Sequence, residues 1–185
     1  VVERPGRADH FVLELVEGEP RFSIGDQAAW DRIELSPSLA RELHGADAFV
    51  FGTLAQRTPL GSEALAAGLE QLQPRCLRIA DLNVRPPHVT ERALALALDH
   101  ASIVKLNETE EQRIAEVLKT QDVTAALFAR GVALIARTLG ARGAELLTRN
   151  HSERHQGFPA SPSGDPVGAG DAFAAVVAAE LCRGT

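Results

Sequence analysis

The chain has 185 residues, of which 45% are hydrophobic and 24% charged, and it carries a formal net charge of -6. These values are typical of one globular domain with a substantial core, and the negative charge excludes a general nucleic-acid-binding surface. The longest apolar stretch is too short to span a bilayer and the N-terminus lacks the pattern of a signal peptide, so we expect neither a membrane nor a nucleic-acid partner.

Two residue counts bear on where the protein acts and how much of it this chain represents. The two cysteines, Cys76 and Cys182, lie far apart in the sequence, which favours reduced thiols in a cytoplasmic protein over a disulfide. The chain contains no methionine, not even at its start. We therefore expect residues to be missing from one end or both.

The first predicted element is an antiparallel hairpin. Apolar and polar residues alternate on both sides of the tetrapeptide EGEP at residues 17–20, and its Gly and Pro mark a turn. The pattern changes after this hairpin. We therefore divide the chain into a hairpin segment, residues 1–30, and an α/β core, residues 31–185.

From residue 36 onwards, helical segments alternate with short apolar runs. Three predicted helices start with a capping Ser or Thr. In two of them, a proline follows the capping residue at the first helical position. The predicted helices are residues 36–45, 58–73, 90–101, 108–119, 122–131 and 169–182. The predicted strands are residues 46–52, 76–83, 102–110, 132–140 and 144–149.

Two segments near the C-terminus lead to specific expectations about exposure. The helix at residues 169–182 is apolar on nearly every side, so we expect it to be buried. The stretch NHSERHQGF at residues 150–158 is polar, and we expect a solvated loop there.

The alternation of strands and helices predicts βαβ units, hence an α/β fold with a mostly parallel sheet and helices on both faces. In such sheets, ligands bind beyond the carboxyl ends of the strands. The segments that follow strands, DLNVR, KLNETE and TLGARG, together with GDPVGAGD near the C-terminus, are therefore where functional residues are expected.

The GAGD stretch at residues 168–171 combines glycines with an acid where a helix starts. Free backbone N–H groups and the helix dipole would make an anion site there. Asp171, in the first turn, could accept a proton from a hydroxyl that attacks phosphorus. Taken alone, the motif is equally compatible with a tight glycine turn and an ordinary first-turn acid.

Four motifs in order resemble the ribokinase-like, or PfkB, family of carbohydrate kinases. They are DLNVRP, KLNETE, TLGARG and DPVGAGDAF, and the segments FSIGDQAAWDRI and DAFVFGTLAQRTP are similar to fructokinase-like members. The resemblance implies a three-layer αβα fold with a mostly parallel sheet and a small β-hairpin lid. It maps onto the central and later part of the family fold. The family's N-terminal part, with a sugar-binding aspartate and a di-glycine motif, is absent from this chain.

The resemblance assigns roles to the residues of the GAGD and NETE motifs. Asp171 would be the catalytic base, and the turn before it would form the anion hole for the γ-phosphoryl group of ATP. Asn107 and Glu110 would place Mg²⁺ around the ATP phosphates; the alternative is that they form a capping box for their helix. The residues of the anion-hole turn are Gly168, Ala169 and Gly170.

Thr138, Gly140 and Gly143 would line the phosphate and ribose side of ATP. The alternative is that this segment is a connection between a strand and a helix that merely needs glycine. Asp165 resembles the acid that helps bind a monovalent cation such as K⁺ in many members. Pro166 follows it where the family usually has threonine, and proline lacks both a hydroxyl and an N–H.

Asp81, Asn83 and Arg85 of the DLNVR segment would contact the substrate. Arg85 could pair with a phosphate or a substrate oxygen, and the alternative for it is a surface salt bridge.

The function implied is an ATP-dependent sugar kinase, most like fructokinase. The alternatives within the family are a 2-keto-3-deoxygluconate kinase, a ribokinase or a nucleoside kinase, and outside enzymes a non-catalytic sugar- or nucleotide-binding relative. The hairpin would be the lid that closes over the sugar and excludes water, and it would also mediate a homodimer.

Overall fold

A computed structural model describes residues 11–16, 19–24, 28–85, 88–159 and 167–184. It contains two separate sheets. The first is an antiparallel pair, β1 (Phe11–Val16) and β2 (Glu19–Ile24), as the sequence predicts. The second has six strands in the order β3-β4-β5-β6-β7-β8. Its strands are β3 (Ala48–Phe51), β4 (Leu77–Asp81), β5 (Ile103–Asn107), β6 (Leu134–Thr138), β7 (Ala144–Leu147) and β8 (Ser152–His155).

The predicted capping residues begin the early helices. The side chains of Ser36, Thr58 and Thr90 each accept a hydrogen bond from a backbone N–H in the first turn of their helix, which satisfies one of the donors left open at a helix start. None of the helices in the described ranges is long and apolar enough to cross a membrane. The helices are α1 (Pro37–Gly45), α2 (Pro59–Gln71), α3 (Glu91–His100), α4 (Glu108–Leu118), α5 (Val123–Ala129) and α6 (Ala169–Arg183).

Strands β3 to β6 are parallel, and β7 and β8 are antiparallel to their neighbours. The sheet is therefore mostly parallel, as predicted. The expectation of a solvated loop at residues 150–158 was wrong, because Ser152–His155 form the edge strand β8. All four of its side chains are exposed. A strand that buries nothing leaves no alternation of apolar and polar residues in the sequence.

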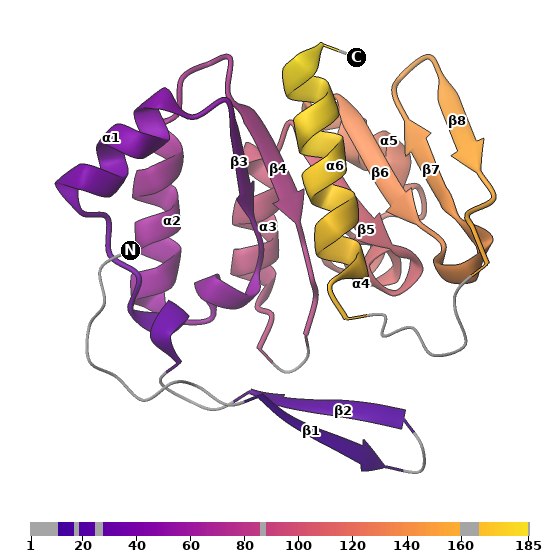
Figure 1. The fold of residues 1–185 in the computed structure, drawn as a ribbon, viewed down its shortest axis with the longest axis horizontal. Coiled ribbons are helices and arrows are strands. Elements are labelled where there is room, and N and C mark those ends of the chain that lie inside the picture. The colour runs from indigo at the N-terminus through magenta and orange to yellow at the C-terminus, as the bar shows by residue number, and fades with distance from the viewer. Residues whose placement is uncertain (1–10, 17–18, 25–27, 86–87, 160–166, 185) are drawn as a thin grey trace.

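The main core lies between the sheet and the helices α2 to α5, which cover one face (Figure 1). α6 lies on the other face (Figure 1), which gives the three layers expected. Fully buried leucines and isoleucines from the strands, the helices and the residue after β4 fill this core. They include Leu82, Leu94, Leu98, Leu106, Ile114, Leu127 and Ile135.

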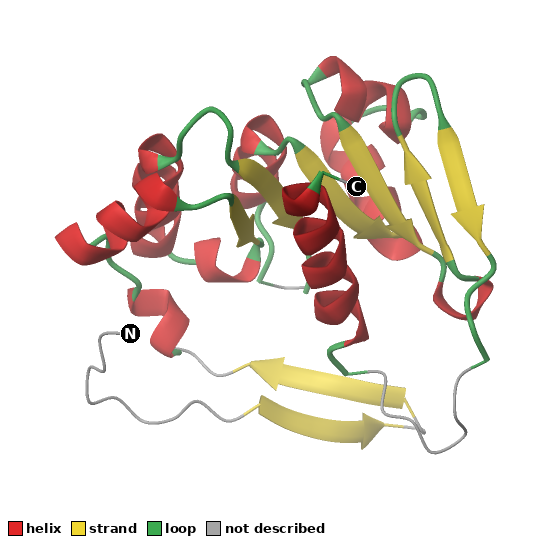
Figure 2. Ribbon diagram, turned by 45° about the horizontal axis from the view of Figure 1, so that its top comes forward, coloured by secondary structure: helices red, strands yellow, loops and turns green. Residues whose placement is uncertain are grey.

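The expectation that the last helix is buried was wrong for the part of the chain that the structure describes. Of the side chains in α6, that of Ala174 is buried, whereas Val176 is 61% exposed. α6 contacts β4, and Figure 2 shows no other helix beside it on that face. A helix that is apolar on all its sides is expected to have neighbours on several of them. Within the described residues, the neighbours of α6 lie on the side that faces the sheet.

A buried ion pair ties the segment after the hairpin to the core. The Arg57 guanidinium donates from Nε to Asp31 Oδ1 at 2.7 Å and from Nη2 to Oδ2 at 2.5 Å. The two side chains are 7% and 6% exposed. Ala28 N also donates to this carboxylate. These hydrogen bonds, above all those from Arg57, hold the pKa of Asp31 below its ordinary value.

We expect Asp31→Asn to destabilise the full-length protein at neutral pH by about 3 kcal/mol, because it leaves the buried Arg57 without its counter-charge. The folded-state pKa of Asp31 is lowered, so its contribution is complete above the unfolded-state pKa of about 3.9 and is lost as the pH falls through the folded-state value. The difference between wild type and variant in denaturant unfolding should thus be large at pH 7 and shrink below pH ~4.

The matched control for this prediction is Asp47→Asn. Asp47 lies 4.0 Å from Arg75 in a pair whose side chains are 76% and 75% exposed, and such pairs contribute little. Equal losses of stability for the two variants would contradict the anchoring role of Asp31.

Candidate active site

Three predicted site residues lie at one edge of the sheet. Asp81, Asn107 and Thr138 are the last residues of the neighbouring parallel strands β4, β5 and β6. Asn107 is the register partner of Thr138. Because parallel strands end at the same edge, the segments DLNVR, KLNETE and TLGARG meet there, as the βαβ pattern indicated. The α6 N-terminus and the hairpin lie toward this edge (Figure 1).

The start of α6 differs from that of α1 to α5, each of which has a side-chain cap. Its N-cap is Gly168, with φ of 81° and no side chain to accept a hydrogen bond. Among the described residues, the first N–H groups of α6 therefore have no side-chain acceptor. Asp171 is exposed in this first turn. Free N–H groups beside a carboxylate suit an anion and a proton acceptor.

A buried lysine that sequence analysis missed lies beneath this turn. Lys105 Nζ donates to Asp81 Oδ1 at 2.8 Å, and the two side chains are 9% and 10% exposed. A Cβ added to Gly170 would lie 2.9 Å from the same Nζ. Lys105 precedes Asn107 by two residues in a strand, which places both on one face of the sheet. That spacing is the signal by which the sequence could have revealed it.

Burial and neighbouring charges have opposing effects on the pKa of the Asp81 carboxyl. Burial raises the pKa of its carboxyl above the ordinary value, although the hydrogen bond and charge of Lys105 oppose this. The nearby charge of Asp171 raises the pKa of Asp81 further. Asp81, Lys105 and Asp171 are thus close enough to form one electrostatic group.

Asn107 and Glu110 form the capping box that was the alternative to a metal role. Asn107 Oδ1 accepts from Glu110 N, and Glu110 Oε2 accepts from Asn107 N, each at 2.9 Å. Glu110 Oε1 also accepts from Val84 N at 3.0 Å, so it joins α4 to the DLNVR segment. Each of its oxygens keeps a second lone pair that could accept a further bond. The metal role stays a prediction.

The segment between Thr138 and Gly143 joins two antiparallel strands, not a strand and a helix as the alternative had it. Thr138 Oγ1 donates to Leu106 O at 3.4 Å. Gly143 has φ of 93°, and a Cβ there would lie 1.9 Å from His155 O. Glycine is therefore required by packing at this position. Whether it also serves a nucleotide is a separate prediction, as it is for Gly140, which has φ of 59°.

The remaining predicted residues are placed unevenly. Asn83 is half-buried with φ of 42°, and the side chain of Arg85 is exposed. Asp165, proposed for a monovalent cation, lies outside the described residues. Within the described ranges, no group of three or more His, Cys, Asp or Glu side chains could hold a metal ion.

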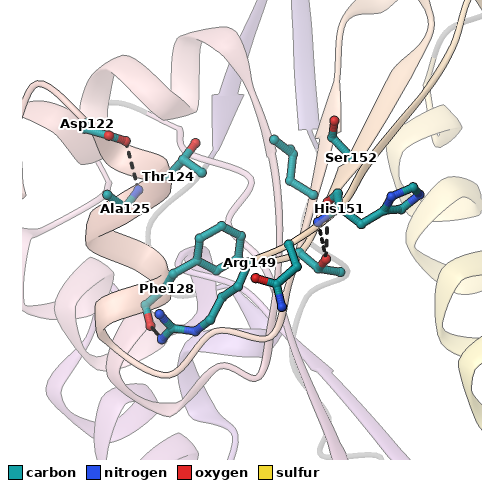
Figure 3. A pocket seen from close by; sticks show the side chains of 10 residues that line it. Asp122, Thr124, Ala125, Phe128, Arg149, His151 and Ser152 are labelled. Carbon is teal, nitrogen blue, oxygen red and sulfur yellow. Dashed lines mark hydrogen bonds between the residues drawn. The ribbon is translucent and has the colours of Figure 1, made fainter.

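A surface hollow lies at the opposite edge of the sheet, between α5 and the β7–β8 turn (Figure 3). Leu147 at the end of β7 pairs with Ile135 near the start of β6, which places this turn far from the strand carboxyl ends. Arg149 lies over the Phe128 ring, 5.7 Å from its centroid, and donates to Phe128 O. Because that cation has protein partners, we assign the hollow no part in the candidate site.

A model of the pfkB family of carbohydrate kinases matches residues 11–185. The chain belongs to this family. No curated protein sequence matches significantly.

Solved structures of pfkB-type kinases share the fold of this chain. A fructokinase with bound ATP from Xylella fastidiosa is 22% identical with a TM-score of 0.77, over 92% of this chain and 55% of its own. A Vibrio cholerae fructokinase with fructose, ADP and calcium is 22% identical with a TM-score of 0.72, over 98% and 59%. A Salmonella enterica aminoimidazole riboside kinase is 22% identical with a TM-score of 0.61, over 75% and 48%. The chain thus spans roughly half to three-fifths of their lengths.

We expect Gly143→Ala to lower the free energy of unfolding of the full-length protein by at least about 3 kcal/mol, because backbone strain adds to the overlap with His155 O. Gly131→Ala is the control: Gly131 has the same φ of 93° with nothing within 4 Å of its Cβ position, so it should lose only the strain energy, about 1–2 kcal/mol. Denaturant unfolding measures both. Equal losses would contradict the packing requirement.

Proposed function

We propose that the full-length protein is an ATP-dependent sugar kinase and that this chain supplies its phosphoryl-transfer site. The observation that carries the proposal is the uncapped start of α6, with Asp171 in its first turn, at the edge where three parallel strands end. The sugar hydroxyl oxygen attacks the γ-phosphorus of ATP. A new O–P bond forms, the bond to the β-phosphate oxygen breaks, ADP leaves, and the hydroxyl proton passes to Asp171.

The N–H groups of the turn from Gly168 to Asp171 stabilise the negative charge on the transferring group. Thr138, Gly140 and Gly143 line the nucleotide, and the DLNVR residues Asp81, Asn83 and Arg85 face the sugar. This assignment is supported by the positions of β4, β5 and β6, whose carboxyl ends bring these segments to one edge.

A fructokinase-like substrate is favoured by the segments FSIGDQAAWDRI and DAFVFGTLAQRTP, and fructokinases are among the structures that share the fold. A nucleoside-type acceptor is the second candidate, because an aminoimidazole riboside kinase shares the fold as well. 2-Keto-3-deoxygluconate, ribose and a non-catalytic binding role are the further alternatives. Assay of ATP consumption against these compounds distinguishes them.

We also propose that residues 1–30 act as a lid over the sugar and as a dimer contact, with residues 31–185 as the core. The Asp31–Arg57 pair supports this division, since it anchors the core just after the hairpin. Both cysteines are free, in keeping with action in the cytoplasm, where ATP is supplied. A K⁺ site at Asp165 is tested by comparing turnover with and without K⁺.

Asp171→Asn should reduce kcat for sugar phosphorylation at least about 100-fold, because the amide cannot accept the hydroxyl proton. ATP affinity should be nearly unchanged, since the N–H groups of the turn remain. Steady-state kinetics and nucleotide titration of the full-length protein measure the two quantities. Turnover close to that of the wild type would overturn the assignment of the base.

The chemistry that Mg²⁺ supplies in this family's reaction is charge neutralisation on the phosphates. If Glu110 helps hold the cation or its water, Glu110→Gln should raise the Mg²⁺ concentration for half-maximal activity about tenfold. Glu116→Gln on the same helix is the control, because its partner Arg113 lies on an exposed surface. A loss of thermal stability with an unchanged Mg²⁺ requirement would leave Glu110 with the capping role alone.

A further inference from the structure

Lys105 occupies an electrostatically unfavourable position. The N-terminus of a helix carries partial positive charge and favours anions, yet this buried ammonium lies against the first turn of α6, within reach of Gly170. Asp81 offsets part of the cost by accepting one hydrogen bond. Buried ion pairs contribute little net stability, so stability alone does not explain a lysine here.

Lysine is rare in this chain. The chain has two lysines, Lys105 and Lys119, against many arginines. Lys119 is exposed at the end of α4, whereas Lys105 is buried in β5. Lys105 is also the lysine that approaches α6: its Nζ would lie 2.9 Å from a Cβ added to Gly170.

We propose that Lys105 is a positioning residue for phosphoryl transfer. It supports the turn that carries Asp171 from below, and its charge adds to that of the α6 N-terminus to attract the γ-phosphoryl group. This inference rests on the proposed function. The formal charge of Asp81, Lys105 and Asp171 together is negative, so without the ammonium two carboxylates would oppose an incoming phosphate.

The contact also constrains residue 170, although φ is not positive there, because the Cβ of an alanine would require Lys105 Nζ, at the end of its side chain, to shift. A Cβ at residue 170 would lie 2.9 Å from Lys105 Nζ but 3.6 Å from Lys105 Cε, and the second distance is an ordinary van der Waals contact. A side chain that ends at the Cε position would therefore tolerate alanine at residue 170. The contact between Lys105 and Gly170 can therefore be tested with variants at the two positions.

The experiment is a double-mutant cycle in the full-length protein with Gly170→Ala, Lys105→Met and both together. Gly170→Ala alone should lower kcat about 100-fold by displacing the Lys105 ammonium from its place against the turn. In the Lys105→Met background the same substitution should cost at least about tenfold less. Thermal unfolding of the four proteins should show the same rescue, so the contact is tested even if no sugar is turned over.

The charge is tested by nucleotide binding without turnover. Lys105→Met should weaken binding of an ATP analogue with a β,γ-methylene bridge about tenfold more than binding of ADP, because the lost charge faces the γ-phosphoryl group. Lys119→Met removes the same charge at the surface and should change neither affinity. Asp81→Asn with Lys105→Met removes both buried charges and keeps the fold testable if Lys105→Met alone unfolds.

The outcomes separate this inference from the proposed function. Additive effects in both kcat and thermal unfolding would overturn the Lys105–Gly170 contact. Rescue in thermal unfolding, with equal losses of ADP and ATP-analogue affinity, would overturn the positioning role and leave a packing role. If the four proteins show the rescue in thermal unfolding but the wild type neither binds ATP nor phosphorylates any sugar, the proposed function is overturned instead.

Discussion

The candidate site depends on the ion pair between Lys105 and Asp81, which links β4 to β5 directly beneath the start of α6. Burial of both partners makes the pair sensitive to its surroundings, since a buried charge without its partner is costly. The pair joins the side chains of two residues that the backbone ladder already places opposite one another. The position of Asp171 follows, because α6 packs on β4 with Gly170 against the ammonium.

The sequence could predict most of the elements because their local signals agree with the packing. Ser36, Thr58 and Thr90 cap helices, and the strands between them are short apolar runs. β8 escaped prediction because all its side chains are exposed. The burial of α6 was overestimated because the apolar residues of a helix show which surfaces favour burial. They do not show whether other elements pack against those surfaces.

The site was predictable only where a residue's role follows from its own local motif. Roles for Asp171 and Gly168 could be proposed from their motif, and the structure places both at the start of α6. The spacing from Asn107 places Lys105 on the same face of the sheet, but its proposed role depends on Gly170, which is distant in sequence and meets it only after β4, β5 and α6 are assembled. Glu110 shows the intermediate case: the capping box was visible in the sequence, while its bond to Val84 N required the fold.

Capping and cation binding need not compete at Glu110. The hydrogen bonds from Asn107 N and Val84 N restrict both carboxylate oxygens, so the side chain is held in one orientation before any ligand arrives. A group held in this way loses little conformational entropy on binding. The same bonds join the DLNVR segment to α4. A displacement of either segment would therefore be transmitted to the other through Glu110, which links the segment proposed to face the sugar to the residues proposed to place Mg²⁺.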